Sequence, residues 1–365
     1  SSLEKELCEI WSEVLKIEKI GVHDNFFRIG GDSIISIQVV AKARQKGIFF
    51  AVKDIFNHPT IASLTAVAKT QEDELKLKPE QKLVKGRAAL TPIQHWFFES
   101  NSPKKNHYNQ SMLLTSHEKL SLSQLESAFS YLLSHHDALR FRYSCVEDQW
   151  AQECLEKEDS SFCSSIDLSH IPNEELAIEI EKACTQAQQS LDIEKGPLIR
   201  VLLLDCGVTQ PQRLLIVIHH LVVDGVSWRI FLEDLERVYS QIARGEAPAL
   251  SPKTHSYQQW GEALRTYATS ESLAEEIPYW SGIEEKIQPL PIDFTHGPAT
   301  VSTSSTFVTT LSEAETTKLL QKVPKAYRTQ INDILLTALV LAVGDWTREY
   351  SMTLSLEGHG REDII

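Results

Sequence analysis

The sequence lacks the features of a membrane-spanning, secreted or nucleic-acid-binding chain. Its 365 residues contain no apolar run near the roughly 18 residues that a spanning helix needs. The longest run, Ile334–Val343, has the length of a core helix. The N-terminus shows no basic–apolar–small signal pattern. The formal net charge of −14 argues against nucleic acid and against an anionic membrane surface as partners.

Paired cysteines are also missing. The 6 cysteines include no Cys-x-x-Cys pair, which predicts free thiols in a cytoplasmic protein and excludes a disulfide frame or a zinc site. The remaining composition, 42% hydrophobic and 24% charged, is ordinary for a folded chain. The length suggests about two to three domains, each long enough to bury a core.

The most informative stretch is an apolar run that ends in two histidines. Leu214–Ile218 predicts a strand buried on both faces and continuing to Val223, with His219 and His220 inside it. Neighbouring strand residues point to opposite faces, so we expect one histidine to serve structure and the other to face a cavity. Imidazole there can give or take a proton near neutral pH. Asp224 can brace the following turn or hold one ring in a single tautomer.

This His-His-x-x-x-Asp-Gly pattern resembles the active-site motif of the condensation and epimerisation domains of nonribosomal peptide synthetases. The motif alone does not separate these two domain types, and it does not exclude related acyltransferases. A single histidine after an apolar strand is most often a hydrogen-bonded core residue, so the spacing to Asp224 and Gly225 carries the prediction.

Residues 1–70 predict a small bundle of four helices. The helical segments are 3–14, 33–45, 52–56 and 61–69, with Thr60 as the N-cap of the last. The pair Gly30-Gly31 allows a tight turn and leaves Ser33 at a helix N-terminus, where a negative group is favoured. From the residues alone, Ser33 is either a plain N-cap or the attachment point of a phosphodiester.

The motif Asp-x-Phe-Phe-x-x-Gly-Gly-x-Ser at residues 24–33 resembles a peptidyl carrier domain, in which this serine carries 4′-phosphopantetheine. The resemblance therefore implies covalent phosphopantetheine on Ser33. Asp32 is the variant associated with carriers that precede epimerisation domains. The partners implied are a phosphopantetheinyl transferase, an upstream adenylation domain and a downstream condensation domain of the assembly line.

The rest of the chain divides by composition. Residues 71–89 predict a charged, solvated linker, 90–285 an N-terminal lobe, 286–302 a crossover rich in Pro, Gly, Ser and Thr, and 303–365 the start of a C-terminal lobe. Alternating strands and helices after residue 90 predict a two-layer α/β sandwich, which the resemblance identifies with the chloramphenicol-acetyltransferase-like fold. The predicted strands are 109–114, 141–143, 198–205, 214–223, 306–311 and 350–356, and the predicted helices are 122–134, 172–191, 225–244, 256–269, 273–283, 312 onward and 332–344.

Two motifs favour epimerisation over condensation. Pro-Ile-Gln-His-Trp-Phe, at residues 92–97, resembles the opening motif of epimerisation domains. Glu-Gly-His-Gly-Arg-Glu, at residues 357–362, is the epimerisation form of a segment that lacks this first glutamate in condensation domains. The second histidine pair, His135-His136, has no further metal ligand at useful spacing and resembles a structural segment of the family. We therefore expect no metal site.

Inverting a stereocentre next to a thioester carbonyl needs one group on each face of the α-carbon. The resemblance implies that His220 and Glu357 are these two catalytic groups and that Asp224, His219 and Gly225 support the site. If the two lobes face each other across a cleft, burial there should raise the pKa of Glu357. Trp228 either lines the cavity or packs in the core, with core packing favoured. Two alternatives stay open: a condensation domain that forms peptide bonds, and a non-catalytic carrier with a docking scaffold.

The family's second lobe continues past the Glu-Gly-His-Gly-Arg-Glu motif, whereas this sequence ends at Ile365. We expect the sequence to cover part of a longer polypeptide. If it were the whole chain, we would expect unpaired sheet edges, an open cleft and little turnover.

Overall fold

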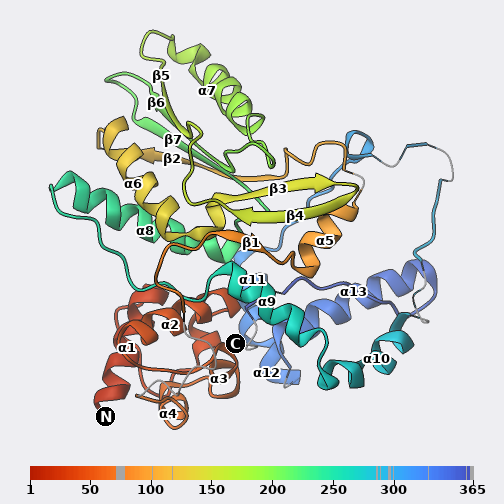
Figure 1. Cartoon of the computed structure of the whole chain (residues 1–365). Coiled ribbons are helices and arrows are strands. Elements are labelled where there is room, and N and C mark those ends of the chain that lie inside the picture. Colours follow the sequence, from red (N-terminus) through yellow and green to blue (C-terminus); the bar gives the residue numbers. More distant parts are fainter. Residues whose placement is uncertain are drawn as a thin grey trace.

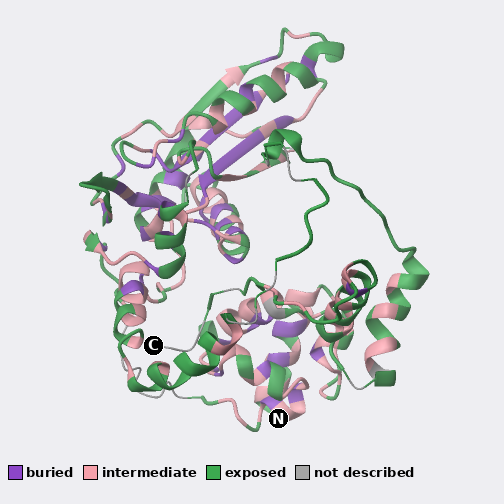
Figure 2. Cartoon of the chain, turned by 90° about the vertical axis from the view of Figure 1, so that its right-hand side faces the viewer, coloured by how far each residue is buried: buried purple, intermediate pink, exposed green. Residues whose placement is uncertain are grey.

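The computed structural model describes residues 1–70, 79–100, 102–116, 118–284, 287, 289–294, 297–298, 300–327, 329–358 and 360–361, without the side chains of Ser33 and Lys325. Two regions with buried cores stand out: the first seventy residues and the sheets that follow (Figures 1 and 2). No helix within the described ranges has the length and apolarity to cross a membrane.

The N-terminal region is the predicted helical bundle. Its elements are α1 (Ser2–Leu15), the 3-10 helix η1 (Phe26–Ile29), α2 (Ser33–Gln45), α3 (Val52–Asn57) and α4 (Ile61–Leu64). Its core consists of fully buried apolar side chains, among them Leu7, Ile10, Trp11, Phe26, Ile55 and Leu64. Thr60 caps α4 as predicted. Helix α4 ends before the predicted residue 69 because Phe49 and Lys69 exchange two backbone hydrogen bonds, of 2.8 and 2.9 Å.

A four-stranded sheet forms the centre of the second region. Its strands are β2 (Asn109–Ser116), β7 (Gln212–His219), β6 (Ile199–Asp205) and β5 (Cys163–Asp167), in that order, and only the β5–β6 pair is parallel. Helices α6 (Leu122–His135) and α8 (Gly225–Ala243) cover one face, and α7 (Asn173–Gln188) covers the other (Figure 1). Alternate residues of β6 and β7 enter the two cores, which confirms burial on both faces.

Strand β7 ends at His219, so the prediction that it continues to Val223 is wrong. The backbone N–H of Val222 donates to the carbonyl of His219, which closes a turn at once. The N–H of His220 donates instead to the carbonyl of Tyr108, at 2.8 Å. His220 is therefore the first residue beyond the sheet, held by the segment that leads into β2.

A second sheet has the order β1 (Gly86–Ala88), β4 (Gln149–Cys154), β3 (Phe141–Val146), with α5 (Pro92–Glu99) and the 3-10 helix η2 (Asp137–Arg140) beside it. Strand β1 belongs to the predicted linker 71–89, so the prediction of a solvated linker is wrong for its C-terminal part. Residues 71–78 lie outside the described residues. The C-terminal part of the predicted linker is not solvated because Val84 is apolar and buried and because β1 pairs with β4.

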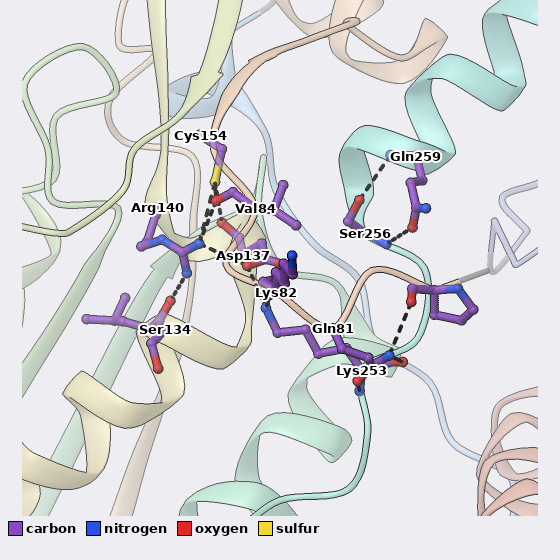
Figure 3. Close-up of polar contacts among 12 residues, drawn as sticks. Gln81, Lys82, Val84, Ser134, Asp137, Arg140, Cys154, Lys253, Ser256 and Gln259 are labelled. Atoms are coloured by element: carbon purple, nitrogen blue, oxygen red, sulfur yellow. Dashed lines mark hydrogen bonds and ion pairs between the residues drawn. The ribbon is translucent and has the colours of Figure 1, made fainter. Parts of the chain in front are cut away.

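Polar side chains hold this linker end in place (Figure 3). The buried guanidinium of Arg140 donates to the carbonyl of Val84 and to the Asp137 carboxylate, both at 2.9 Å. Lys253 Nζ lies 3.0 Å from the same carboxylate. Gln81 and Lys253 exchange two hydrogen bonds of 2.9 Å through the Gln81 amide and the Lys253 backbone. The chain is thus fixed to the sheet region from Gln81 onward.

The remaining elements are α9 (Tyr257–Tyr267), α10 (Glu271–Glu284), the 3-10 helix η3 (Val301–Thr303), α11 (Glu313–Gln321), α12 (Val323–Tyr327) and α13 (Ile331–Thr347). The chain from α10 onward is largely exposed (Figure 2). The predicted strands 306–311 and 350–356 are wrong, because within the described residues neither segment has a neighbouring strand to pair with. Among the described residues, this part of the chain thus consists of helices and irregular segments.

Candidate functional site

His219 is the buried histidine of the pair. Its side chain has no exposed surface, Nε2 donates to the Lys105 carbonyl at 2.8 Å, and Nδ1 accepts from the Leu221 backbone N–H at 3.2 Å. Burial, with the nearby ring of His220, lowers the pKa of His219 to about 4. The ring is therefore neutral at physiological pH, and both nitrogens are occupied by the backbone.

His220 lies at the surface end of the same turn and is half-buried. Its Nδ1 lies 2.8 Å from the carbonyl oxygen of Val223. A carbonyl oxygen can only accept, so Nδ1 carries the hydrogen. The ring stacks on Tyr108, with centroids 5.1 Å apart and an interplanar angle of 20°. The turn therefore leaves Nε2 as the nitrogen directed away from the backbone.

Three residues near His220 were not predicted as its neighbours from the sequence. The amide nitrogen of Gln110 lies 3.2 Å from Nε2 of His220, and the amide oxygen of Gln110 accepts from the indole N–H of Trp228 at 2.8 Å. Trp228 is buried and belongs to the core between α8 and the sheet, as favoured from the sequence. Tyr108 precedes strand β2 and Gln110 lies in it. The pairing of β2 with β7 places Asn109, which lies between them, opposite His219.

Asp224 is the N-cap of α8. Its carboxylate accepts from the backbone N–H and the hydroxyl of Ser227, both at 2.7 Å, and pairs with both terminal nitrogens of Arg361, at 2.8 and 3.1 Å. Burial acts to raise the pKa of Asp224, but hydrogen bonds and charge from Arg361 and Ser227 outweigh it and hold that pKa below its ordinary value. Asp224 is thus an ionised brace between two motifs.

Gly225 is the first residue of α8 and does not adopt a left-handed backbone conformation. A Cβ built on it would meet no atom within 4 Å. The glycine therefore leaves open space over the first turn of the helix, next to Asp224.

Glu357 is exposed, so the expectation of a carboxyl buried in a cleft is wrong. The reason is that the chain after α10 packs little against the rest of the described residues. Arg361, four residues later, is nevertheless paired with Asp224. Four residues of chain span at most about 14 Å, so this ion pair limits how far Glu357 can lie from the turn that carries His220.

Ser33 is the first residue of α2; its side chain lies outside the described part of the structure. Asp32 is the N-cap and accepts from the Ile35 N–H at 2.7 Å. Gly30 has a φ of 105°, and a Cβ on Gly31 would lie 2.4 Å from the ring of Phe26. The two glycines are therefore required for the turn that brings the chain to Ser33, and a phosphodiester fits at the start of this thirteen-residue helix.

One ring of the second histidine pair lies beside a carboxylate. Nε2 of His136 lies 3.0 Å from the Asp234 carboxylate, and burial lowers the pKa of His135. Among the residues that the structure describes, no group of three or more His, Cys, Asp or Glu side chains is arranged to hold a metal ion. All six cysteines are free thiols.

Two protein families match this sequence. Residues 84–364 match the Condensation domain family, and residues 5–68 match the phosphopantetheine attachment site family. One of the linear gramicidin synthase proteins of Brevibacillus parabrevis is 47% identical over 368 residues, which cover 100% of this chain and 7% of that protein. Surfactin synthase subunit 1 of Bacillus subtilis is 39% identical over 372 residues, 100% of this chain and 10% of that protein. The chain thus spans only a small part of these relatives.

Solved structures show the same fold. The epimerization domain from the third module of tyrocidine synthetase B is 38% identical, with a TM-score of 0.70, over 80% of this chain and 64% of that one. A starter condensation domain of rhizomide synthetase is 20% identical, with a TM-score of 0.55, over 72% of this chain and 59% of that one. The second likeness concerns the fold alone.

Proposed function

This chain belongs to the condensation-domain family of nonribosomal peptide synthetases and carries a phosphopantetheine attachment domain, and from this premise we propose that it epimerises the Cα of a carrier-bound aminoacyl or peptidyl thioester. The substrate is attached to Ser33 through phosphopantetheine, and the product is a D/L mixture. When attached, phosphopantetheine supplies the thiol that holds the acyl group as a thioester. Asp32, Gly30 and Gly31 shape the turn that presents Ser33.

One observation carries the proposal: the bidentate ion pair between Arg361 and Asp224. It joins the motif that contains Glu357 to the turn that contains His220. A condensation reaction uses the histidine turn but has no role for Glu357. The likeness to the epimerization domain, at 38% identity, supports the same choice.

The two side chains divide the proton transfer between them. Nε2 of His220 accepts the α-proton, and the C–H electron pair forms a double bond to the thioester carbon, which leaves the enolate oxygen negative. Glu357 passes a proton from water to the other face of Cα, and the electron pair returns from the oxygen. Both groups then exchange their protons with water. His219, Asp224 and Gly225 hold the turn and do not react.

Deuterated water separates the candidate activities. An L-aminoacyl group loaded on Ser33 gains deuterium at Cα and becomes a D/L mixture if the chain is an epimerase. Peptide formation with a second loaded carrier, without Cα exchange, would instead show a condensation domain. An unchanged product after His220→Ala and after Glu357→Gln would show a non-catalytic scaffold.

Loading itself is tested apart from catalysis. Ser33→Ala abolishes the mass gain of the phosphopantetheinyl group after treatment with a phosphopantetheinyl transferase. The neighbouring variant Ser36→Ala retains that gain, because Ser36 is fully buried and its hydroxyl bonds to the carbonyl of Asp32.

A further inference from the structure

The hydrogen bonds around His220 form a directional chain that starts in the core. The indole N–H of Trp228 can only donate, so the atom facing it at 2.8 Å must be the oxygen of the Gln110 amide. This fixes the orientation of the amide and turns its NH2 group toward Nε2 of His220, at 3.2 Å. Trp228 has 3% of its surface exposed, so water does not readily replace its acceptor.

From this chain we propose that Gln110 and Trp228 are positioning residues that keep His220 singly protonated, with hydrogen on Nδ1 and the lone pair on Nε2. Val223 O holds the hydrogen on Nδ1, and the amide of Gln110 donates to Nε2. The atom that must accept the substrate proton is thereby defined before substrate arrives.

A second proton on the ring disrupts the chain. A hydrogen on Nε2 would face the NH2 group of Gln110, donor against donor. Turning the amide would restore that contact but would direct its NH2 group at the indole N–H of Trp228. Either arrangement loses one hydrogen bond, so the chain disfavours a proton that remains on Nε2.

This arrangement assigns the order of proton transfer, and that assignment rests on the proposed function. His220 begins as the base, and Glu357 delivers a proton to the opposite face. The α C–H of the substrate replaces the Gln110 amide at Nε2 when it approaches. Once the proton has moved to Nε2, the same donor-against-donor contact favours its release to the substrate or to water, which resets the ring.

The resting state is measured without substrate. Histidine labelled with 15N in the ring is incorporated into the whole chain, and the His220 signals are those that vanish in His220→Ala. We expect a protonated-type Nδ1 and an unprotonated-type Nε2 in the unmodified protein at pH 7. A ring that carries its hydrogen on Nε2, or that is already doubly protonated, would overturn the proposal.

The coupling is tested with Trp228→Phe, which leaves the His220 side chain unchanged but frees the Gln110 amide to turn. We expect the ratio of doubly to singly protonated His220 at pH 6.5 to rise about fivefold, the equivalent of one hydrogen bond. Gln110→Leu should give the same rise, and Gln110→Glu, which offers a carboxylate to the ring, a larger one. The double variant Gln110→Leu/Trp228→Phe should show no more than Gln110→Leu, because Trp228 acts through the amide.

Trp280→Phe is the matched control, since its exposed indole bonds only to Glu276. The other titratable groups around the ring are Tyr108, stacked on it, His219, one residue back, and Asp224 with Arg361 beyond the turn. They stay in place in every variant. An unchanged His220 spectrum in both Trp228→Phe and Gln110→Leu would overturn the coupling.

The catalytic consequence has its own readout. In Trp228→Phe and Gln110→Leu, the acidic limb of the pH–rate profile for Cα exchange should move to higher pH, with a small change in the plateau rate. A uniform loss of rate at all pH values would show a merely structural role. If no exchange occurs in any form of the protein, the proposed function fails while the spectra of the resting ring still decide the hydrogen-bond chain.

Discussion

At the scale of single residues, two adjacent histidines differ because one lies inside the sheet and the other just beyond it. The period of a strand predicts that His219 and His220 have different surroundings, and the structure gives one a closed set of backbone partners and the other a side-chain partner. Sequence alone does not identify Gln110, because its partnership arises from the pairing of β2 with β7 across about 100 residues.

The buried ring of His219 makes stability depend on pH. Its pKa is about 4 in the folded chain, below its ordinary value of 6.5, so the unfolded chain binds the proton first as pH falls. The stabilisation is present above pH 6.5 and is lost between pH 6.5 and 4, by up to about 3 kcal/mol. Urea unfolding across this range should show the loss, and His219→Gln should weaken the dependence. An unchanged dependence in this variant would assign it to other groups.

A substitution at Gly225 tests whether the substrate approaches the first turn of α8. Gly225→Ala places a methyl group where no atom outside its own helical turn lies within 4 Å, at the first residue of a helix, and alanine forms helices more readily than glycine. We expect equal or higher thermal stability together with a rise in KM for the carrier-bound substrate. A variant with unchanged KM would show that the substrate does not approach this turn.

At the scale of elements, β6 and β7 are predictable because unbroken apolar runs suit strands buried on both faces. Strands β4 (Gln149–Cys154) and β5 (Cys163–Asp167) were not predicted, since their polar side chains give no apolar pattern and their conformation depends on neighbouring strands. The same dependence explains why 306–311 and 350–356, which look like strands in sequence, remain unpaired.

The ion pair between Asp224 at the start of α8 and Arg361 in the C-terminal motif should affect the rate of Cα exchange more than the free energy of unfolding. Arg361→Ala removes both hydrogen bonds to Asp224, and the paired groups are each about 38% exposed, so the loss of stability should stay within about 1 kcal/mol. Cα exchange should fall at least about tenfold, because Glu357 is no longer held near the histidine turn.

Arg244→Ala is the matched control for that brace. It breaks a comparable ion pair with Glu246 on an exposed surface and should leave both stability and exchange unchanged. Equal exchange rates in Arg361→Ala and Arg244→Ala would remove the main support for a role of Glu357.

Buried ion pairs of Asp137 with Arg140 and Lys253 hold the C-terminal end of the linker against the sheet region. Lys253→Met leaves the carboxylate of Asp137 with Arg140 as its remaining charged partner, and we expect a loss of about 1–3 kcal/mol in the free energy of unfolding. Lys85→Met, which breaks the exposed pair with Glu156, should cost less than about 0.5 kcal/mol. Similar losses in both variants would contradict the importance of the buried network.

At the scale of the whole molecule, a carrier region and a sheet region share one chain whose link is fixed from Gln81 onward. Composition predicts the two regions because the charged linker predicted at residues 71–89 separates two sets of apolar periodicities. It does not predict where the link joins the sheet region, because that depends on Val84 and on the pairing of β1 with β4. Fixing the link at Gln81 shortens the segment that joins the carrier region to the sheet region.

The most direct measurement follows the α-proton from each enantiomer separately. Carriers loaded with L- or D-aminoacyl groups, deuterated at Cα, are placed in ordinary water, and loss of deuterium is timed for the unmodified protein, His220→Ala and Glu357→Gln. With one group on each face, we expect His220→Ala to lose exchange from one enantiomer only. Glu357→Gln should lose exchange from the other enantiomer only. Equal loss from both enantiomers in both variants would contradict two groups acting on opposite faces.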